Sequence, residues 1–207
     1  ELVSRLPDGS LHRYRYADFA DRTRQLANAL GALGIKSGDR VATLCWNEYR
    51  HLELYFAVPM TGAVVHTLNA RLHPDELAYI INDAEDRVLF VHRSLLNAFE
   101  EIRDRVNIEN VVVIPDEGPA PADCRDYEEL ISEQSDKFES PPLDERQASG
   151  MCHTSGTTGR PKGVLYSHRS TALLAMMSGM VDTVGMSERD CVLPVVPMYH
   201  ANAWGLP

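Results

Sequence analysis

The segment best suited to chemistry is a short loop rich in hydroxyl groups and glycine. The sequence HTSGTTGRPKGV covers residues 153–164, and residues 154–159 within it are all Thr, Ser or Gly. Glycine lets a backbone approach an anion closely and turn its N–H groups towards it. Lys162 adds a positive charge that suits phosphate. The segment therefore predicts a polyphosphate site, and a flexible Ser/Gly linker is the alternative.

The best-known phosphate loops differ from this segment at decisive positions. In the Walker A pattern G-x-x-x-x-G-K-[ST], counted from Gly156, Lys162 occupies the lysine position. Pro161 replaces the second glycine, and Gly163 replaces the hydroxyl residue that would hold Mg²⁺. The residues that follow indicate a strand, whereas a P-loop needs a helix N-terminus. A P-loop kinase or NTPase is therefore disfavoured, and a G-x-G-x-x-G dinucleotide fingerprint is absent from the sequence.

Alternating strand and helix patterns surround the loop. The expected strands begin near residue 11 and near residue 148, and cover 40–45, 63–68, 87–92, 111–114, 162–168 and 191–196. The expected helices run from near Asp18 to Gly34, and over 49–62, 74–84, 94–105, 127–133 and about 169–184. Near-continuous apolar strands joined by helices predict an α/β fold, with largely parallel sheets flanked by helices.

The alternation breaks once, which predicts how the chain is divided. Residues 115–147 hold five prolines and many acidic residues, and we expect a surface excursion without a function of its own. A first α/β subdomain is expected over 1–114. The start of a second, which carries the phosphate loop, is expected over 148–207.

The composition of the 207 residues is that of an ordinary globular protein, with 44% hydrophobic and 24% charged residues. The net charge of -10, with Lys and Arg scattered among acidic residues, argues against a nucleic-acid partner. Four widely spaced cysteines form no C-x-x-C pair, which favours a reducing, cytoplasmic setting. The sequence holds no apolar run of the roughly 18 residues that predict a transmembrane segment, and no signal-peptide pattern.

Two motifs together resemble the adenylate-forming enzymes, the superfamily of acyl-CoA synthetases, firefly luciferase and peptide-synthetase adenylation domains. TSGTTGRPKGV (154–164) resembles their signature phosphate loop, and PMYHANAWG (197–205) resembles their P-x-x-H segment at the acyl pocket. Residues 46–92 are similar to the bacterial branch that acts on medium-chain fatty acids and similar small carboxylates. The resemblance covers essentially the whole chain. It implies the first part of the large N-terminal domain of such an enzyme, with the C-terminal domain absent.

The resemblance implies a two-step reaction. A carboxylate attacks the α-phosphorus of ATP to give acyl-adenylate and pyrophosphate, and the thiol of coenzyme A then forms acyl-CoA and releases AMP. The residues implied to bind the phosphates are Thr154, Ser155, Gly156, Thr157, Thr158, Gly159 and Lys162. Thr154 is also implied to lie near Mg²⁺. His200 and Lys162 are the implied catalytic residues, and His200 and Trp204 are implied to line the acyl pocket.

Other residues were weighed against simpler roles. For His200 and Trp204, the alternative is a position in the core. Cys152 and His153 resemble a nucleophile pair, but neighbours on a strand point to opposite faces, which disfavours it. Three other histidines could be considered as metal ligands, but their spacing is not that of a metal site, so we expect core or solvent roles for His66, His73 and His92.

The sequence therefore predicts part of an acyl-CoA synthetase that activates a fatty or other small carboxylic acid with ATP, Mg²⁺ and coenzyme A. The chain does not begin with Met and ends on apolar residues, so we expect it to belong to a longer protein. Because the family's adenine, ribose and catalytic-lysine motifs are absent, we expect the chain alone to be inactive. The alternative is a non-catalytic nucleotide- or phosphate-binding module. The sequence is compatible with a homo-oligomer and selects no particular acid.

Overall fold

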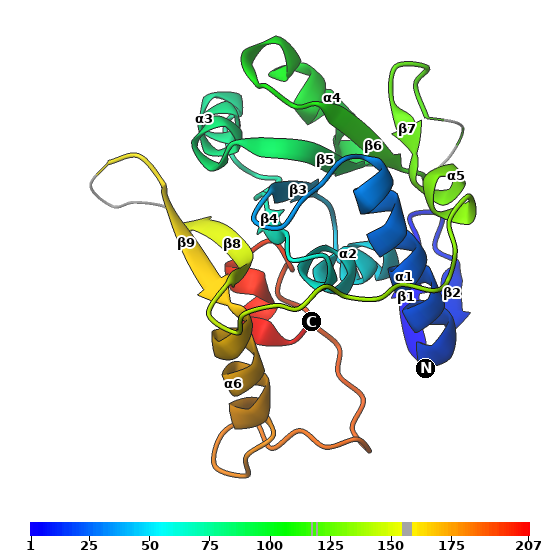
Figure 1. Ribbon diagram of the computed structural model, residues 1–207, viewed down its shortest axis with the longest axis vertical. Helices are drawn as coiled ribbons and strands as arrows, with labels where there is room; N and C mark the ends of the chain where they lie inside the picture. Colours follow the sequence, from blue (N-terminus) through cyan, green and yellow to red (C-terminus); the bar gives the residue numbers. More distant parts are fainter. Residues whose placement is uncertain (117, 119, 155–158) are drawn as a thin grey trace.

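The computed structural model describes residues 1–116, 118, 120–154 and 159–207. Within these ranges, the main sheet has seven strands in the order β7-β6-β5-β3-β4-β8-β9 (Figure 1). A separate N-terminal hairpin pairs β1 (Leu2–Arg5) with β2 (Leu11–Tyr14). The strands of the main sheet are β3 (Arg40–Leu44), β4 (Val64–Thr67), β5 (Asp86–His92), β6 (Asn110–Ile114), β7 (Arg125–Asp126), β8 (Ala148–Thr154) and β9 (Lys162–Ser167).

The main sheet is parallel from β7 to β8, and its last pair, β8 and β9, is antiparallel. The connection between β8 and β9 is too short for the crossover that a parallel pair needs, which explains the reversal. The predicted α/β fold with a largely parallel sheet is confirmed. β8 pairs with β4, so residues on both sides of the 115–147 segment share one sheet. The division into two subdomains stays a prediction.

Helices cover both faces of this sheet. The helices α1 (Tyr16–Ala32), α2 (Tyr49–Met60) and α5 (Tyr127–Ser132) pack on one face, and α3 (Pro74–Ala84) and α4 (Leu96–Glu100) on the other. In β5, Val88 and Phe90 join the first core, whereas Leu89 and Val91 join the second. This alternation is the two-residue period of a strand that is buried on both faces. The long apolar runs in the sequence follow from it.

A largely buried ionic cluster ties α1, α2 and α5 together. Arg22 Nε lies 2.7 Å from Glu53 Oε1, and Arg22 Nη1 lies 2.9 Å from Glu128 Oε2. Arg50 joins Glu128 at 2.6 Å and Glu48 at 3.0 Å. Burial raises the pKa of Glu53, and it raises the pKa of Glu48 to about 7 against the opposing effect of Arg50.

Two predicted elements differ from the structure between residues 94 and 184. The single helix predicted over 94–105 is wrong: the structure has a 3₁₀ turn η1 (Arg93–Leu95), then α4, then a second turn η2 (Arg103–Arg105). The backbone leaves the helical region at Ile102, whose φ is -120° and ψ -1°. The helix predicted over 169–184 is shorter, because α6 (His168–Ser178) ends at Gly179 and the next residues form turns.

The strand predicted over 191–196 is also wrong, because these residues form no strand in the structure. Pro194 interrupts the run and has no backbone N–H to donate. The carbonyls of Pro194 and Val196 accept hydrogen bonds from the side chain of Asn47 rather than from a neighbouring strand. In Figure 1 this segment is the long orange coil that follows α6.

Candidate functional site

The stems of the predicted phosphate loop form the end of the β8–β9 hairpin, at one edge of the sheet (Figure 1). Thr154 pairs with Lys162 in the antiparallel register, and the Thr154 Oγ1 lies 3.5 Å from the Lys162 carbonyl oxygen. Both residues are exposed. The strand predicted at 162–168 is confirmed as β9, so the loop is followed by a strand and not by the helix of a P-loop.

The described part of the loop leaves room for an anion. Gly159 is exposed with φ +158°, and a Cβ built on it would meet nothing within 4 Å. Among the described residues, Lys162 takes part in no ion pair, so its ammonium group is available for a phosphate. Four predicted phosphate-binding residues lie outside the described residues: Ser155, Gly156, Thr157 and Thr158.

The second predicted motif closes the chain in a 3₁₀ turn, η3 (Ala201–Gly205). His200 precedes η3, its side chain is exposed, and its N–H donates to the Pro197 carbonyl at 2.9 Å. The core alternative for His200 is therefore wrong. Trp204 belongs to η3, and its side chain lies outside the described part of the molecule.

The structure places both motifs at the carboxyl edge of two neighbouring parallel strands. Thr67 ends β4 and pairs with Cys152, two residues before the end of β8. The Thr67 hydroxyl donates to Asn202 of η3 at 3.2 Å. In open α/β sheets, ligands bind outside the carboxyl ends of the strands. The loop stem follows the end of β8 and the P-x-x-H segment adjoins the end of β4, so both lie at the edge where such sheets bind ligands.

A side chain that the sequence did not single out holds the P-x-x-H segment. Asn47 lies between β3 and α2, and its Nδ2 donates to the carbonyls of Pro194 (3.1 Å) and Val196 (2.9 Å). Its Oδ1 accepts from the N–H of Met198 at 2.7 Å. Tyr55 on α2 donates from its hydroxyl to the Met198 carbonyl. A lone Asn in a loop gives no pattern by which sequence analysis could find it.

A chain of four titratable side chains runs beneath the loop stem. Asp86 Oδ2 lies 2.7 Å from His66 Nδ1, His66 Nε2 lies 2.9 Å from His153 Nδ1, and His153 Nε2 lies 3.2 Å from Asp83 Oδ2. His153 is the residue before Thr154, so this series of side chains adjoins the loop stem.

Burial shifts the pKa values of two side chains in this hydrogen-bonded series. The side chains of His66 and Asp86 have no exposed surface, and burial raises the pKa of Asp86 against the opposing effect of His66. Burial likewise lowers the pKa of His153. The sequence left core and solvent roles open for three histidines. His66 and His92 are buried in the core, whereas His73 is exposed.

Cys152 and His153 do not act as a pair in this structure. Cys152 is buried and its Sγ lies 3.6 Å from the Tyr166 hydroxyl, whereas the His153 ring contacts His66. The two side chains therefore contact different neighbours, because successive side chains of a strand point to opposite faces. All four cysteines are free.

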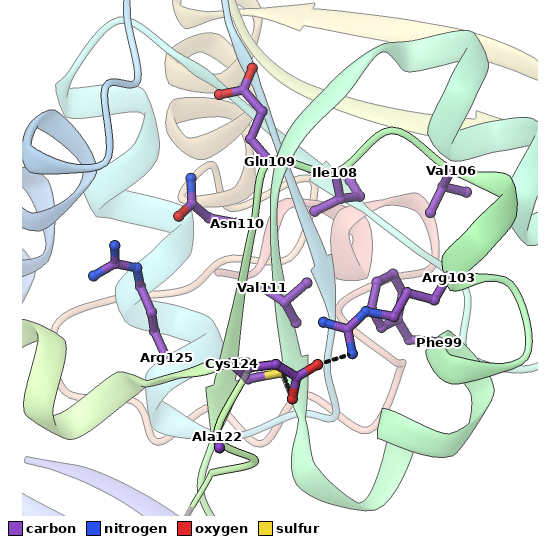
Figure 2. Close-up of a pocket in the computed structure, with 11 residues that line it drawn as sticks. Phe99, Arg103, Val106, Ile108, Glu109, Asn110, Val111, Ala122, Cys124 and Arg125 are labelled. Atoms are coloured by element: carbon purple, nitrogen blue, oxygen red, sulfur yellow. Dashed lines mark hydrogen bonds and ion pairs between the residues drawn. The ribbon is translucent and has the colours of Figure 1, made fainter.

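Two pockets lie near opposite ends of the strands. A pocket of about 370 Å³ has a lining that includes Phe99, Arg103, Val111 and Cys124 (Figure 2). Arg103 also forms an ion pair with Asp123, which lines the same pocket. It lies at the start of β6, towards the opposite edge of the sheet from β8 and β9. It is therefore no part of the candidate site. A second pocket, of about 360 Å³, adjoins the carboxyl ends of β3 and β5, and its lining includes Trp46, Asn47, Glu48 and His92.

The chain is an α/β protein with a largely parallel sheet, and its candidate functional segments lie at the carboxyl edge, where sheets of this class bind ligands. The model of the family described as "AMP-binding enzyme" matches residues 3–206, and the chain belongs to this family. No helix among the described residues is long and apolar enough to cross a membrane.

Curated relatives and solved structures agree with this assignment. The chain is 51% identical to the long-chain-fatty-acid–CoA ligase of Thermus thermophilus, over 100% of this chain and 38% of that protein. It is 44% identical to the medium-chain-fatty-acid–CoA ligase of Ectopseudomonas oleovorans, over 100% of this chain and 39% of that protein. The crystal structure of the anthranilate CoA ligase AuaEII with anthranoyl-AMP matches with a TM-score of 0.78 and 30% identity, over 84% of this chain and 33% of that one. The chain thus spans less than two fifths of the length of these relatives.

Proposed function

We propose that the whole protein carrying this chain is an acyl-CoA synthetase. It activates a fatty or other small carboxylic acid with ATP to an acyl-adenylate and transfers the acyl group to coenzyme A. The observation that carries the proposal is the placement of the loop stem and the P-x-x-H segment at the ends of β8 and β4, which are adjacent strands. Ligases that act on carboxylic acids and share this chain's sequence support the reaction class.

The loop stem is proposed to hold the β- and γ-phosphates of ATP. Lys162 brings a positive charge that no described acidic residue neutralises, and Gly159 leaves space for close approach. Mg²⁺ commonly takes one or two protein ligands together with phosphate oxygens. The exposed hydroxyl of Thr154 fits a ligand of that kind, and the ion would supply further neutralisation of phosphate charge.

His200 is proposed to hold the acid in line with the α-phosphorus. A carboxylate oxygen forms the new bond to phosphorus while the bond to the departing pyrophosphate breaks. The imidazole of His200 is exposed and is not engaged by a described side chain, so it is free to contact the carboxylate and the α-phosphate. Positioning and charge stabilisation are the contributions that such phosphoryl chemistry needs from a protein. Trp204 is proposed to line the acyl pocket.

Three further parts of the proposal concern the protein as a whole. The chain alone is proposed to be inactive, because it spans 38% to 39% of its curated relatives. The setting is proposed to be cytoplasmic, which the four free cysteines support. The proposal leaves the oligomeric state open, and a homo-oligomer is compatible with it.

Exchange of radioactive pyrophosphate into ATP by the whole protein tests the function. Carboxylic acids of increasing length are compared, with Lys162→Ala and His200→Ala as variants. Lys137→Ala and His73→Ala are the matched controls, because both side chains are exposed and lie outside the candidate site. We expect acid-dependent exchange that both site variants reduce and both controls keep. ATP binding without exchange for any acid would instead identify a non-catalytic nucleotide-binding module.

A further inference from the structure

One side-chain amide holds the backbone that leads to His200. Asn47 uses both of its N–H groups on the carbonyls of Pro194 and Val196, and its oxygen accepts from the N–H of Met198 at 2.7 Å. These three bonds bracket Pro197, which begins the P-x-x-H segment. Asn47 itself sits in the short connection between β3 and α2, whose flanking residues are buried.

The held segment has no regular structure of its own. Residues 191–196 form no strand, and Leu193 and Val195 are each 82% exposed. Among the described residues, the Pro194 and Val196 carbonyls bond to Asn47 and to no backbone N–H. The Asn47 side chain therefore holds the backbone of this segment by hydrogen bonds, as a neighbouring strand does elsewhere in the sheet.

A second anchor lies on the far side of His200. Asn202 adopts the left-handed conformation, with φ +48°, and its Oδ1 lies 3.2 Å from the Thr67 hydroxyl and 3.3 Å from the Tyr55 hydroxyl. Tyr55 also donates to the Met198 carbonyl. His200 thus lies between two anchored residues, Met198 and Asn202. Among the described residues, His200 makes its hydrogen bonds through its backbone: its N–H donates to the Pro197 carbonyl, and its carbonyl accepts from the N–H of Ala203.

We propose that Asn47 is a positioning residue for His200: it fixes the backbone of residues 194–198 so that the imidazole stands at the carboxyl edge of β4 and β8. The proposal rests on the function proposed above. Asn47 makes no hydrogen bond to a described residue of β8 or β9, so we expect the loop stem that is proposed to hold ATP not to depend on it. Asn47 then affects the position of the acid, through His200, and leaves the affinity for ATP unchanged.

The expected size of the effect follows from geometry. A displacement of about 1 Å at a reacting centre costs on the order of 10²-fold in rate. Asn47→Ala removes all three bonds and should lower kcat for acid-dependent pyrophosphate exchange by about 100-fold. Asn47→Asp keeps the acceptor for Met198 and places a negative charge against two carbonyls, so it should be no better. The dissociation constant of ATP should stay within about twofold, since the loop stem is untouched.

The matched control is Asn28→Ala. Asn28 also donates two hydrogen bonds from Nδ2 to backbone carbonyls, those of Ser135 (2.8 Å) and Lys137 (2.9 Å), on the α1 side of the molecule. It loses the same kind of contact without touching the segment that leads to His200. Its kcat should equal that of the unaltered protein. A loss of the same size in Asn28→Ala would show that kcat reports general loosening, which would overturn the proposal.

A double-mutant cycle with His200→Ala in the whole protein decides the question. If Asn47 acts through His200, Asn47→Ala should cost about 100-fold alone and less than about threefold in the His200→Ala background. Equal losses in both backgrounds overturn the proposal, as does an unchanged kcat in Asn47→Ala. A loss of ATP affinity that parallels a fall in Tm overturns it too. Absence of exchange in the unaltered protein refutes the proposed function itself, which separates the two failures.

Discussion

Replacing His66 with leucine removes the hydrogen-bond partner of a carboxylate that has no exposed surface. Among the described residues, Asp86 Oδ2 bonds to His66 at 2.7 Å, and Asp86 Oδ1 has no partner. Breaking a buried pair by removing one member costs about 3–5 kcal/mol, because the remaining charge stays buried without compensation. For a domain of this size, about 2–4 °C is lost per kcal/mol, so Tm should fall by roughly 6–20 °C.

The dependence of this loss on pH follows from the sign of the shift. Burial raises the folded-state pKa of Asp86, so the folded protein binds the proton more tightly than the unfolded chain. Stability from such a group is fully present below the unfolded pKa and is lost as pH rises through the folded pKa. Without His66 the ionised carboxylate is disfavoured further, so the destabilisation should be larger at pH 8 than at pH 5.

Calorimetry of the whole protein at both pH values measures the loss, in the transition of the domain that contains this sheet. The double variant His66→Leu/Asp86→Leu removes both members of the pair, and it should recover at least half of the loss because no buried charge remains. A loss below about 1 kcal/mol at pH 8, or one that grows towards pH 5, would refute the reasoning.

Three further changes test other parts of the fold. The raised pKa of Glu48, about 7, makes the protein lose about 3 kcal/mol as pH rises from about 4.5 to 7, and Glu48→Gln should abolish that dependence in urea unfolding. Arg22→Leu leaves the buried Glu53 carboxylate without its cation and should cost about 3 kcal/mol, measured by the urea midpoint at pH 7. Gly62→Ala should cost about 1–3 kcal/mol in thermal unfolding, because φ is +84° and the new Cβ would meet Ser37 Oγ at 2.9 Å.

Local patterns in the sequence were enough to predict most of the fold. Val88 to Val91 alternate between two cores, so the strand reads as a continuous apolar run with helices on both faces. Pro74 marked the start of α3 by its fixed φ, whereas the left-handed conformation of Glu85 at the other end is known from the structure alone. The strand predicted over 191–196 failed because an apolar run does not show whether a partner strand exists, and Asn47 is the partner instead.

Part of the candidate site could likewise be predicted from the sequence, and part could not. Thr154, Lys162 and His200 were predicted because each belongs to a motif that is contiguous in the sequence. Asn47, by contrast, is about 150 residues from the segment that it binds, and single residues at such separations carry no pattern. The pairing of His66 with Asp86 and His153 depends likewise on the order of the strands in the sheet, which only the structure supplies.

β4 relates the two halves of the site to each other. His66 and Thr67 are neighbours on this strand, so their side chains leave opposite faces of the sheet. His66 bonds to His153, which precedes the loop stem, and Thr67 bonds to Asn202, which follows His200. A slip of β4 by one residue would exchange the two side chains and remove both supports together. The register of this short buried strand therefore sets the position of the loop stem and of the P-x-x-H segment at the same time, which explains how two motifs far apart in the sequence keep one geometry.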